Sequence, residues 1–310
     1  MAWSDYVCCL NGDVHRIDWI GGKAASLDRL RALDAPVPPA FAVTTEAYRL
    51  HARQLGIPER ASEVDDAELP AIRERIMTAP MPAPIVEAIA AEIEAIGGSA
   101  TLAVRSSATT EDSPLFSFAG LHDTVLAVDG CPAAVEAAIK ACWASLWSER
   151  SVDYRRRGGA TLDTAAMAVV VQRLVQSDIS FVAFSADPIQ QCAPRVIISA
   201  SYGLGEAIVA GLVVPDYIVL GPDGTVEHYQ IGAKEAMVIP APTGGVRQVP
   251  VPRMLRQMPA LSSEQACEIG GIVRKLEGQF GTPLDIEGGL AGGTIHLFQA
   301  RPITTCAAPV

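Results

Sequence analysis

The sequence has few basic residues, with 24 lysines and arginines against 35 aspartates and glutamates and a formal net charge of −11. Non-specific binding to nucleic acid needs a basic face that attracts phosphates. The charge balance therefore argues against nucleic acid as a partner. It also means that the cations needed to hold an anionic ligand must be concentrated locally.

Other absences narrow the class of protein. The seven cysteines form no C-x-x-C pair and no other paired spacing, so we expect reduced thiols. The N-terminal residues lack the basic segment and long apolar run of a secretory signal. No run of about 18 apolar residues is free of charges and turn residues, so no membrane span is expected. The cytoplasm follows as the expected compartment.

What is present is typical of a folded globular protein. Hydrophobic residues make up 49% of the chain and charged residues 19%. A chain of 310 residues is long enough for a large core and for a division into two lobes.

The most informative segment is Leu102–Thr124. It begins as an apolar strand at Leu102–Val104 and continues with Arg105 and a run of hydroxyl residues. Small side chains let backbone N–H groups and hydroxyls approach phosphate oxygens, and a guanidinium binds the same oxygens through paired hydrogen bonds. The segment does not match the P-loop pattern G-x-x-x-x-G-K-[ST]. On composition alone, a phosphate-binding loop and a hydroxyl-rich surface turn are equally open.

A second candidate for anion binding is the turn Gly21-Gly22-Lys23, which precedes a predicted helix that begins near Ala24. A glycine turn at a helix start exposes backbone N–H groups, and Lys23 adds a positive charge there. A lone lysine at a helix start is more often simply solvated, so the pattern leaves both interpretations open.

A predicted hairpin near the end of the chain gathers polar side chains. The strand Leu284–Glu287 alternates apolar and acidic residues, which puts Asp285 and Glu287 on one face. The returning strand places Gln299 and Arg301 on one face by the same alternation. Carboxylate and amide oxygens are Mg²⁺ ligands, and an arginine there could clamp a transferring phosphoryl group. An acidic hairpin face is, however, usually just solvated.

Motifs distributed in order along nearly the whole chain resemble one family. They are Gly21–Leu27, Phe41–Thr45, Val104–Asp112 followed by Ser117–Gly120 and Asp123-Thr124, Ser201–Glu206, and Gln299–Pro302. Together they resemble the nucleotide-binding domain shared by phosphoenolpyruvate synthases, pyruvate phosphate dikinases and rifampicin phosphotransferases.

The resemblance implies an α/β (α+β) protein with an ATP-grasp-type fold, in which ATP lies in the cleft between two lobes. We place the N-terminal lobe at residues 1–175, with a small helical insertion at about 56–100. The C-terminal lobe, at residues 176–310, is expected to carry the metal-binding and catalytic hairpin.

The resemblance also implies a set of site residues. The expected ATP-binding residues are Lys23, Arg105, Gly120, Thr124, Gln172, Glu287, Gln299 and Arg301. Three cations among them, Lys23, Arg105 and Arg301, are expected to be catalytic. Glu287, Gln299 and the neighbouring Asp285 are expected to hold Mg²⁺, and Gln172 to meet the adenine edge.

In the resembled family, the β-phosphoryl group of ATP passes to a histidine on a swivelling domain and AMP is a product. None of the five histidines lies in a sequence like that domain's motif, so a separate phosphohistidine domain or protein is the expected partner. Pyruvate or another small molecule is the expected final acceptor. Two alternatives stay open: part of a split ligase-type biosynthetic enzyme that activates its substrate by phosphorylation, and a non-catalytic nucleotide-sensing partner.

Overall fold

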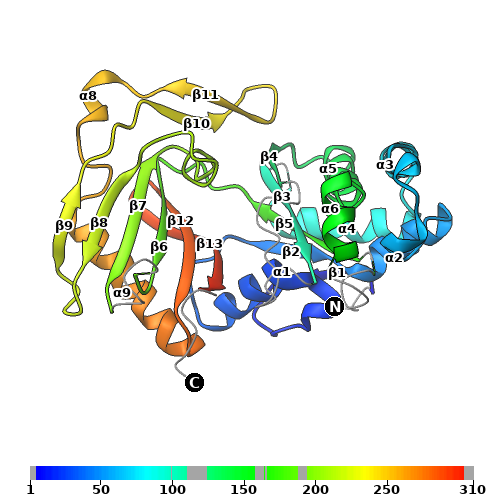
Figure 1. Ribbon diagram of the computed structural model, residues 1–310, viewed down its shortest axis with the longest axis horizontal. Coiled ribbons are helices and arrows are strands. Elements are labelled where there is room, and N and C mark those ends of the chain that lie inside the picture. Colours follow the sequence, from blue (N-terminus) through cyan, green and yellow to red (C-terminus); the bar gives the residue numbers. More distant parts are fainter. Residues whose placement is uncertain are drawn as a thin grey trace. The chain divides into compact units, whose positions relative to one another are not determined.

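The computed structural model describes residues 5–98, 100–109, 124–157, 164, 166–187 and 194–303. The chain divides into two compact units (Figure 1). Unit 1 comprises Met1–Ala32 and Pro39–Leu174, and unit 2 comprises Leu33–Pro38 and Val175–Val310. Each unit combines a sheet with helices, which confirms the expected mixed α/β class. The assignment of these units to the two lobes of an ATP-grasp fold stays a prediction.

Unit 1 is built on a five-stranded antiparallel sheet of order β1-β2-β5-β3-β4. Its elements are β1 (Val7–Cys9), α1 (Ile17–Ala32), β2 (Ala40–Val43), α2 (Thr45–Gln54), the 3₁₀ turns η1 (Ala61–Glu63) and η2 (Asp66–Glu68), α3 (Leu69–Thr78), α4 (Ala83–Ala95), β3 (Leu102–Ala108), β4 (Thr124–Val128), α5 (Pro132–Ser145), α6 (Glu149–Arg157) and β5 (Met167–Arg173).

The two faces of this sheet carry different side chains. One face presents large apolar residues such as Phe41, Val104 and Val171, which join the helices α2 to α6 in one hydrophobic core around the buried Trp143 and Trp147. Burying each large apolar side chain contributes about 1.5–3 kcal/mol before entropy is counted. The opposite face presents alanines at positions 40, 42, 103 and 168, whose small side chains let α1 pack closely.

Unit 2 contains a six-stranded antiparallel sheet of order β13-β12-β6-β7-β8-β9 and a separate two-stranded sheet of β10 and β11. Its elements are β6 (Ile179–Phe184), β7 (Val196–Tyr202), α7 (Glu206–Val209), β8 (Asp216–Leu220), β9 (Val226–Gln230), β10 (Ala236–Pro240), β11 (Val246–Pro250), α8 (Arg253–Arg256), α9 (Ser263–Phe280), β12 (Leu284–Ala291) and β13 (Thr294–Pro302).

Helix α9 packs along one face of the six-stranded sheet (Figure 1). It begins with a capping box of Ser262 and Gln265, which the S-x-x-Q spacing predicts, and ends at Gly281, which is left-handed with φ 72°. Gly270 brings the helix close to the sheet, because a Cβ there would lie 2.3 Å from Leu220 Cδ1. In each strand, the residues that alternate with those packed against α9 lie on the opposite face of the sheet.

The structure differs from the predictions at three points. The strand expected to stop at Val104 continues through Ala108, since β5 pairs with β3 as far as that residue. The sequence Pro132–Arg150 predicts one amphipathic helix, but the structure has two, because the Ser148 hydroxyl accepts from the Ser151 N–H (3.3 Å) and α6 begins after Ser148. The β10–β11 sheet was not anticipated from the sequence.

Among the described residues, no single helix is long and apolar enough to cross a membrane. One pair bent by 60°, Asp66–Thr78 with Ala83–Ala95, passes that test only when the two helices are taken together. The isoleucines at positions 72, 76, 85, 89 and 93 of this pair are buried in the core of unit 1.

Candidate functional site

In unit 1, the predicted anion-binding turn lies against β3. Helix α1 starts at Ile17, earlier than predicted, and is interrupted at Gly21, whose φ of 76° and ψ of 169° are non-helical. The Ser107 hydroxyl fills the interruption, since its Oγ donates to Ile20 O (2.9 Å) and accepts from the Ala24 N–H (3.1 Å). In a continuous helix these two backbone groups would bond each other. The hydroxyl is thus inserted into the helix ladder, a recognised cause of a kink.

Only glycine fits at the centre of this kink. A Cβ on Gly21 would lie 2.0 Å from Ser107 O and 2.4 Å from its Oγ. The backbone conformation of Gly21 is also one that residues with a Cβ rarely adopt. The close approach of α1 to β3 therefore requires glycine at position 21.

Three of the predicted site residues lie on the elements that form this contact or on the strand paired with them. Lys23 is half-buried and directly precedes Ala24. Arg105 lies two residues before Ser107 on the same face of β3, opposite Thr124 of β4. The contact between α1 and β3 therefore brings two cations and a hydroxyl into one region of unit 1.

The hydroxyl run is divided between two faces of the sheet. Ser106 and Ser107 lie within β3, so they are not loop residues as the phosphate-loop interpretation expected. Ser106 alternates with Ser107 and shares the face of Val104, in the core, where its Oγ has no hydrogen-bond partner. The remainder of the predicted loop, including Gly120, lies outside the described residues.

Gln172 lies on β5 between Ala40 of β2 and Ala103 of β3, on the same sheet face as Arg105. Its side chain is only 2% exposed, yet its Nε2 has no hydrogen-bond partner. Leaving a buried donor unsatisfied costs about 1–3 kcal/mol. An acceptor atom on a ligand would remove that cost, which fits the predicted contact with a base edge.

In unit 2, the four hairpin residues lie on one face. Asp285 of β12 is opposite Arg301 of β13, and Glu287 is opposite Gln299, as the alternation predicts. The intervening Ile286 is buried toward α9. Asp285 is 6% exposed and Gln299 is 7% exposed, so the interpretation as a solvated acidic face is wrong for both.

Asp285 and Arg301 form an ion pair. Arg301 donates a hydrogen bond from Nε to Asp285 Oδ2 (2.8 Å), and its NH2 nitrogen lies 2.7 Å from the same oxygen. The other oxygen, Oδ1, is buried without a hydrogen-bond partner. Burial raises the pKa of Asp285, while the charge of Arg301 opposes that rise and the charge of Glu287 adds to it.

The hairpin side chains suit a metal ion whose remaining ligands are phosphate oxygens and waters. In the described part of the chain, no group of three or more His, Cys, Asp or Glu side chains forms an all-protein metal site. The hairpin offers two carboxylates and one carboxamide, with Asp285 Oδ1 unengaged by any hydrogen bond. Mg²⁺ is usually held by one or two carboxylates, waters and substrate phosphates, so these donors suit it.

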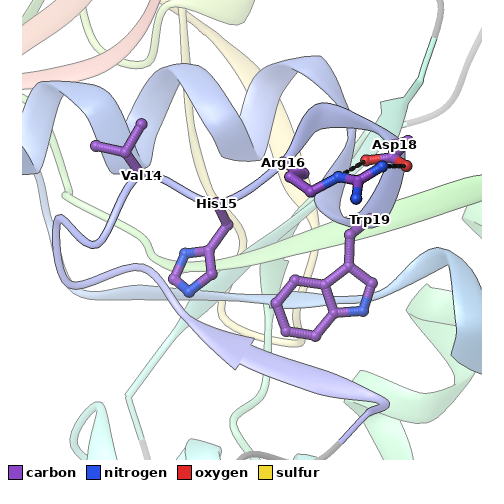
Figure 2. A pocket seen from close by; sticks show the side chains of 5 residues that line it. All are labelled: Val14, His15, Arg16, Asp18 and Trp19. Atoms are coloured by element: carbon purple, nitrogen blue, oxygen red, sulfur yellow. Dashed lines mark hydrogen bonds and ion pairs between the residues drawn. The ribbon is translucent and has the colours of Figure 1, made fainter.

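Just before the kink, unit 1 has an open pocket of about 460 Å³ (Figure 2), lined by Val14, His15, Arg16, Asp18 and Trp19. The His15 and Trp19 rings lie 5.6 Å apart. Asp28, fully buried on α1, holds this loop by accepting from Gly12 N (2.8 Å) and lying 2.7 Å from His15 Nδ1. The loop that enters the kink is therefore anchored.

Two arginines outside the predicted site set have structural roles. Arg155 donates to Leu146 O (2.6 Å) and lies over the Trp147 ring at 5.0 Å. Arg156 donates to Ala61 O (3.2 Å) and pairs with Asp66 (2.6 Å). The basic end of α6 thus fastens the helix to its surroundings.

Sequence reasoning missed two contacts in this site. The insertion of Ser107 into α1 joins residues 83 to 87 positions apart, and no local pattern signals it. The pairing of Asp285 with Arg301 could have been found from the hairpin register, because alternation places the two opposite each other.

Residues 17–309 match the protein family described as "Pyruvate phosphate dikinase, AMP/ATP-binding domain". The chain is 40% identical over 305 residues to a rifampicin phosphotransferase of Streptomyces sviceus, covering 94% of this chain and 35% of that protein. It is 38% identical to the prodigiosin synthesizing transferase PigC of Serratia marcescens, covering 94% and 32%. It is 36% identical to a probable phosphoenolpyruvate synthase of Methanocaldococcus jannaschii, covering 98% and 27%. The chain spans about a third of the length of these curated relatives.

Proposed function

The chain belongs to the pyruvate phosphate dikinase AMP/ATP-binding domain family, as its motifs predicted, and we propose that it binds Mg-ATP as the phosphoryl-donor part of a phosphotransferase. Its relatives carry the names of a rifampicin phosphotransferase and a probable phosphoenolpyruvate synthase, and the region they share with it covers 35% and 27% of their lengths. The acceptor chemistry is therefore assigned to a further domain or protein.

The observation that carries the proposal is the polar face of the β12–β13 hairpin. Asp285, Glu287, Gln299 and Arg301 lie on one face as two cross-strand pairs, and two of them are buried. Asp285 Oδ1 is buried without a hydrogen-bond partner among the described residues, and a buried carboxylate oxygen left unsatisfied is costly. A metal ion that also binds phosphate would occupy that oxygen, which supports a nucleoside triphosphate as the ligand.

In unit 1, Lys23 and Arg105 are proposed to bind phosphate oxygens, with Thr124 beside them. A guanidinium binds two oxygens at once, whereas a lysine acts as a point charge. Gln172 is proposed to donate a hydrogen bond from Nε2, which has no partner in the described part of the chain, to an acceptor on the adenine edge. ATP is thereby proposed to lie in a cleft between two ATP-grasp lobes.

Mg²⁺ at Glu287, Gln299 and Asp285 would neutralise phosphate charge and orient the phosphates. Arg301 and Arg105 stabilise the charge that develops on the transferred group. A histidine nitrogen on the separate swivelling domain bonds to the β-phosphorus. The bond from that phosphorus to the α–β bridging oxygen breaks and AMP leaves, which puts a pyrophosphoryl group on the histidine. Water then attacks the γ-phosphorus, the bond from that phosphorus to the β–γ bridging oxygen breaks, and inorganic phosphate leaves. The phosphohistidine then serves pyruvate or another small acceptor.

Calorimetry of the chain with ATP, with and without Mg²⁺, tests the proposal. We expect binding that Mg²⁺ strengthens. Arg301→Ala should raise the dissociation constant about ten- to a hundredfold, as expected for one hydrogen-bonded charge. Arg195→Ala is the matched control, because Arg195 is 39% exposed and paired with Glu227, as Arg301 is 41% exposed and paired with Asp285. No heat of binding at millimolar ATP in either condition would contradict the proposal.

A further inference from the structure

We propose that Ser107 is a positioning residue that sets where Lys23 meets the phosphates of bound ATP, an inference that rests on the proposed function. The Ser107 hydroxyl makes both of its hydrogen bonds to the backbone of α1, to Ile20 O and the Ala24 N–H. Both hydrogen bonds involve backbone groups on either side of the Gly21-Gly22-Lys23 turn. Ser107 itself does not need to touch the nucleotide.

The hydroxyl determines the course of α1 at this turn. Without it, Ile20 O and the Ala24 N–H are free to form the ordinary bond of a continuous helix. That bond would rotate the backbone at Gly21 out of its non-helical conformation. Lys23 would then start from a different point on the helix surface.

The same hydroxyl also sets the spacing between the two predicted phosphate-binding cations of unit 1. Arg105 is fixed in the β3 ladder, where it pairs with Val170 of β5. Ser107 lies two residues further on the same face and holds the segment that carries Lys23. Cations from two elements far apart in sequence are thereby kept in one arrangement before ATP arrives, and such preorganisation saves ordering cost on binding.

The adjacent Ser106 provides a matched control. Both serines lie on β3 and are fully buried. Ser106 faces the opposite side, and its hydroxyl has no hydrogen-bond partner. Alanine at either position removes one buried hydroxyl from the same strand, but only the change at Ser107 releases α1.

The test measures the affinities of the chain for Mg-ATP and for adenosine by calorimetry in Ser107→Ala and Ser106→Ala. We expect Ser107→Ala to weaken Mg-ATP binding about tenfold while its affinity for adenosine, which has no phosphates, stays within about twofold of wild type. Ser106→Ala should match wild type for both ligands. A purely structural role for Ser107 would weaken both ligands alike.

A double-mutant cycle with Lys23→Ala identifies the residue through which Ser107 acts. If Ser107 works by placing Lys23, the loss caused by Ser107→Ala disappears once Lys23 has been removed. Additive losses in the double variant would overturn the proposal, and so would equal Mg-ATP affinities of Ser107→Ala and Ser106→Ala.

If Ser107→Ala folds poorly, a second pair of variants tests the same proposal. Thr and Val have nearly the same shape and differ by the hydroxyl, so Ser107→Thr should bind Mg-ATP more tightly than Ser107→Val. Failure of every variant without the hydroxyl to fold would overturn the proposal, because it would assign Ser107 to the fold. Absence of ATP binding by the wild-type chain would contradict the proposed function instead.

Discussion

Two nitrogens of Arg301 contact a single oxygen of Asp285: Nε donates a hydrogen bond at 2.8 Å, and the NH2 nitrogen forms an ion pair at 2.7 Å. The carboxylate therefore orients the guanidinium with Oδ2 and keeps Oδ1, which is buried, without a hydrogen-bond partner. Asp285 can thus orient the Arg301 guanidinium through Oδ2 and present Oδ1 to a metal ion. This arrangement gives the carboxylate two roles that mutation can separate.

The first prediction concerns Asp285→Asn, which keeps the shape and removes the charge. Because burial raises the pKa of Asp285, the native state keeps this proton at a higher pH than the unfolded chain does. The contribution of this group to stability therefore falls as the pH rises above the unfolded value of about 3.9. We expect Asp285→Asn to gain stability relative to wild type as the pH rises, and yet to bind Mg-ATP more weakly. Urea unfolding at several pH values, with calorimetry at pH 7, measures both; a variant that loses stability with rising pH would contradict the sign.

The second prediction concerns the charge of Glu287. Glu287→Gln keeps the length of the side chain but removes a hard anionic ligand. We expect weaker ATP binding in excess Mg²⁺ and unchanged binding in EDTA, because only the metal-bound form uses that charge. Glu227→Gln is the control, since Glu227 is a half-exposed carboxylate on another strand of the same sheet. Equal losses in Mg²⁺ and in EDTA would exclude Glu287 as a metal ligand.

The third prediction concerns a fully buried ion pair in unit 2. Lys234 donates to Asp216, which also accepts from the N–H groups of Gly232 (2.9 Å) and Ala260 (2.6 Å). Lys234→Met leaves Asp216 buried without its cation, and should lower the free energy of unfolding by about 3–5 kcal/mol. The exposed pair of Arg16 and Asp18 is the comparison, and Arg16→Ala should cost far less, because solvent screens that pair. Similar losses in the two variants, measured by urea unfolding, would refute the difference attributed to burial.

The fourth prediction concerns His51, which is 1% exposed and lies 5.4 Å from the Trp143 ring in the core of unit 1. Burial lowers the pKa of His51, so the native state resists protonation. The unfolded chain takes up that proton near pH 6.5, and stability is therefore lost as the pH falls below that value. His51→Phe keeps an aromatic ring and should flatten the decline in melting temperature between about pH 7 and pH 5. An equally steep decline in the variant would exclude His51 as its source.

The sequence by itself determined the elements whose causes are local. The sequence predicts a cap for α2 at Thr44 or Thr45, and the structure has it at Thr44. The start of α9 at Ser262 and Gln265 and its end at Gly281 are predicted in the same way, because capping is a contact between near neighbours in the chain. The alternation at Asp285 and Glu287 predicted their common face for the same reason, since successive side chains of a strand point to opposite sides. The family could also be recognised from the sequence, because its motifs are short and follow one another in order along the chain.

Only the tertiary structure decided which polar side chains are buried and which groups they bond to. Ser106 and Ser107 are identical in sequence terms, yet one hydroxyl lies without a partner in the core and the other replaces a helix bond. Gln172 reads as a polar residue near a strand end, and becomes a buried amide only because β2 and β3 pair on either side of it. Such contacts join segments that are distant in the chain, so their geometry depends on how the sheet and α1 pack.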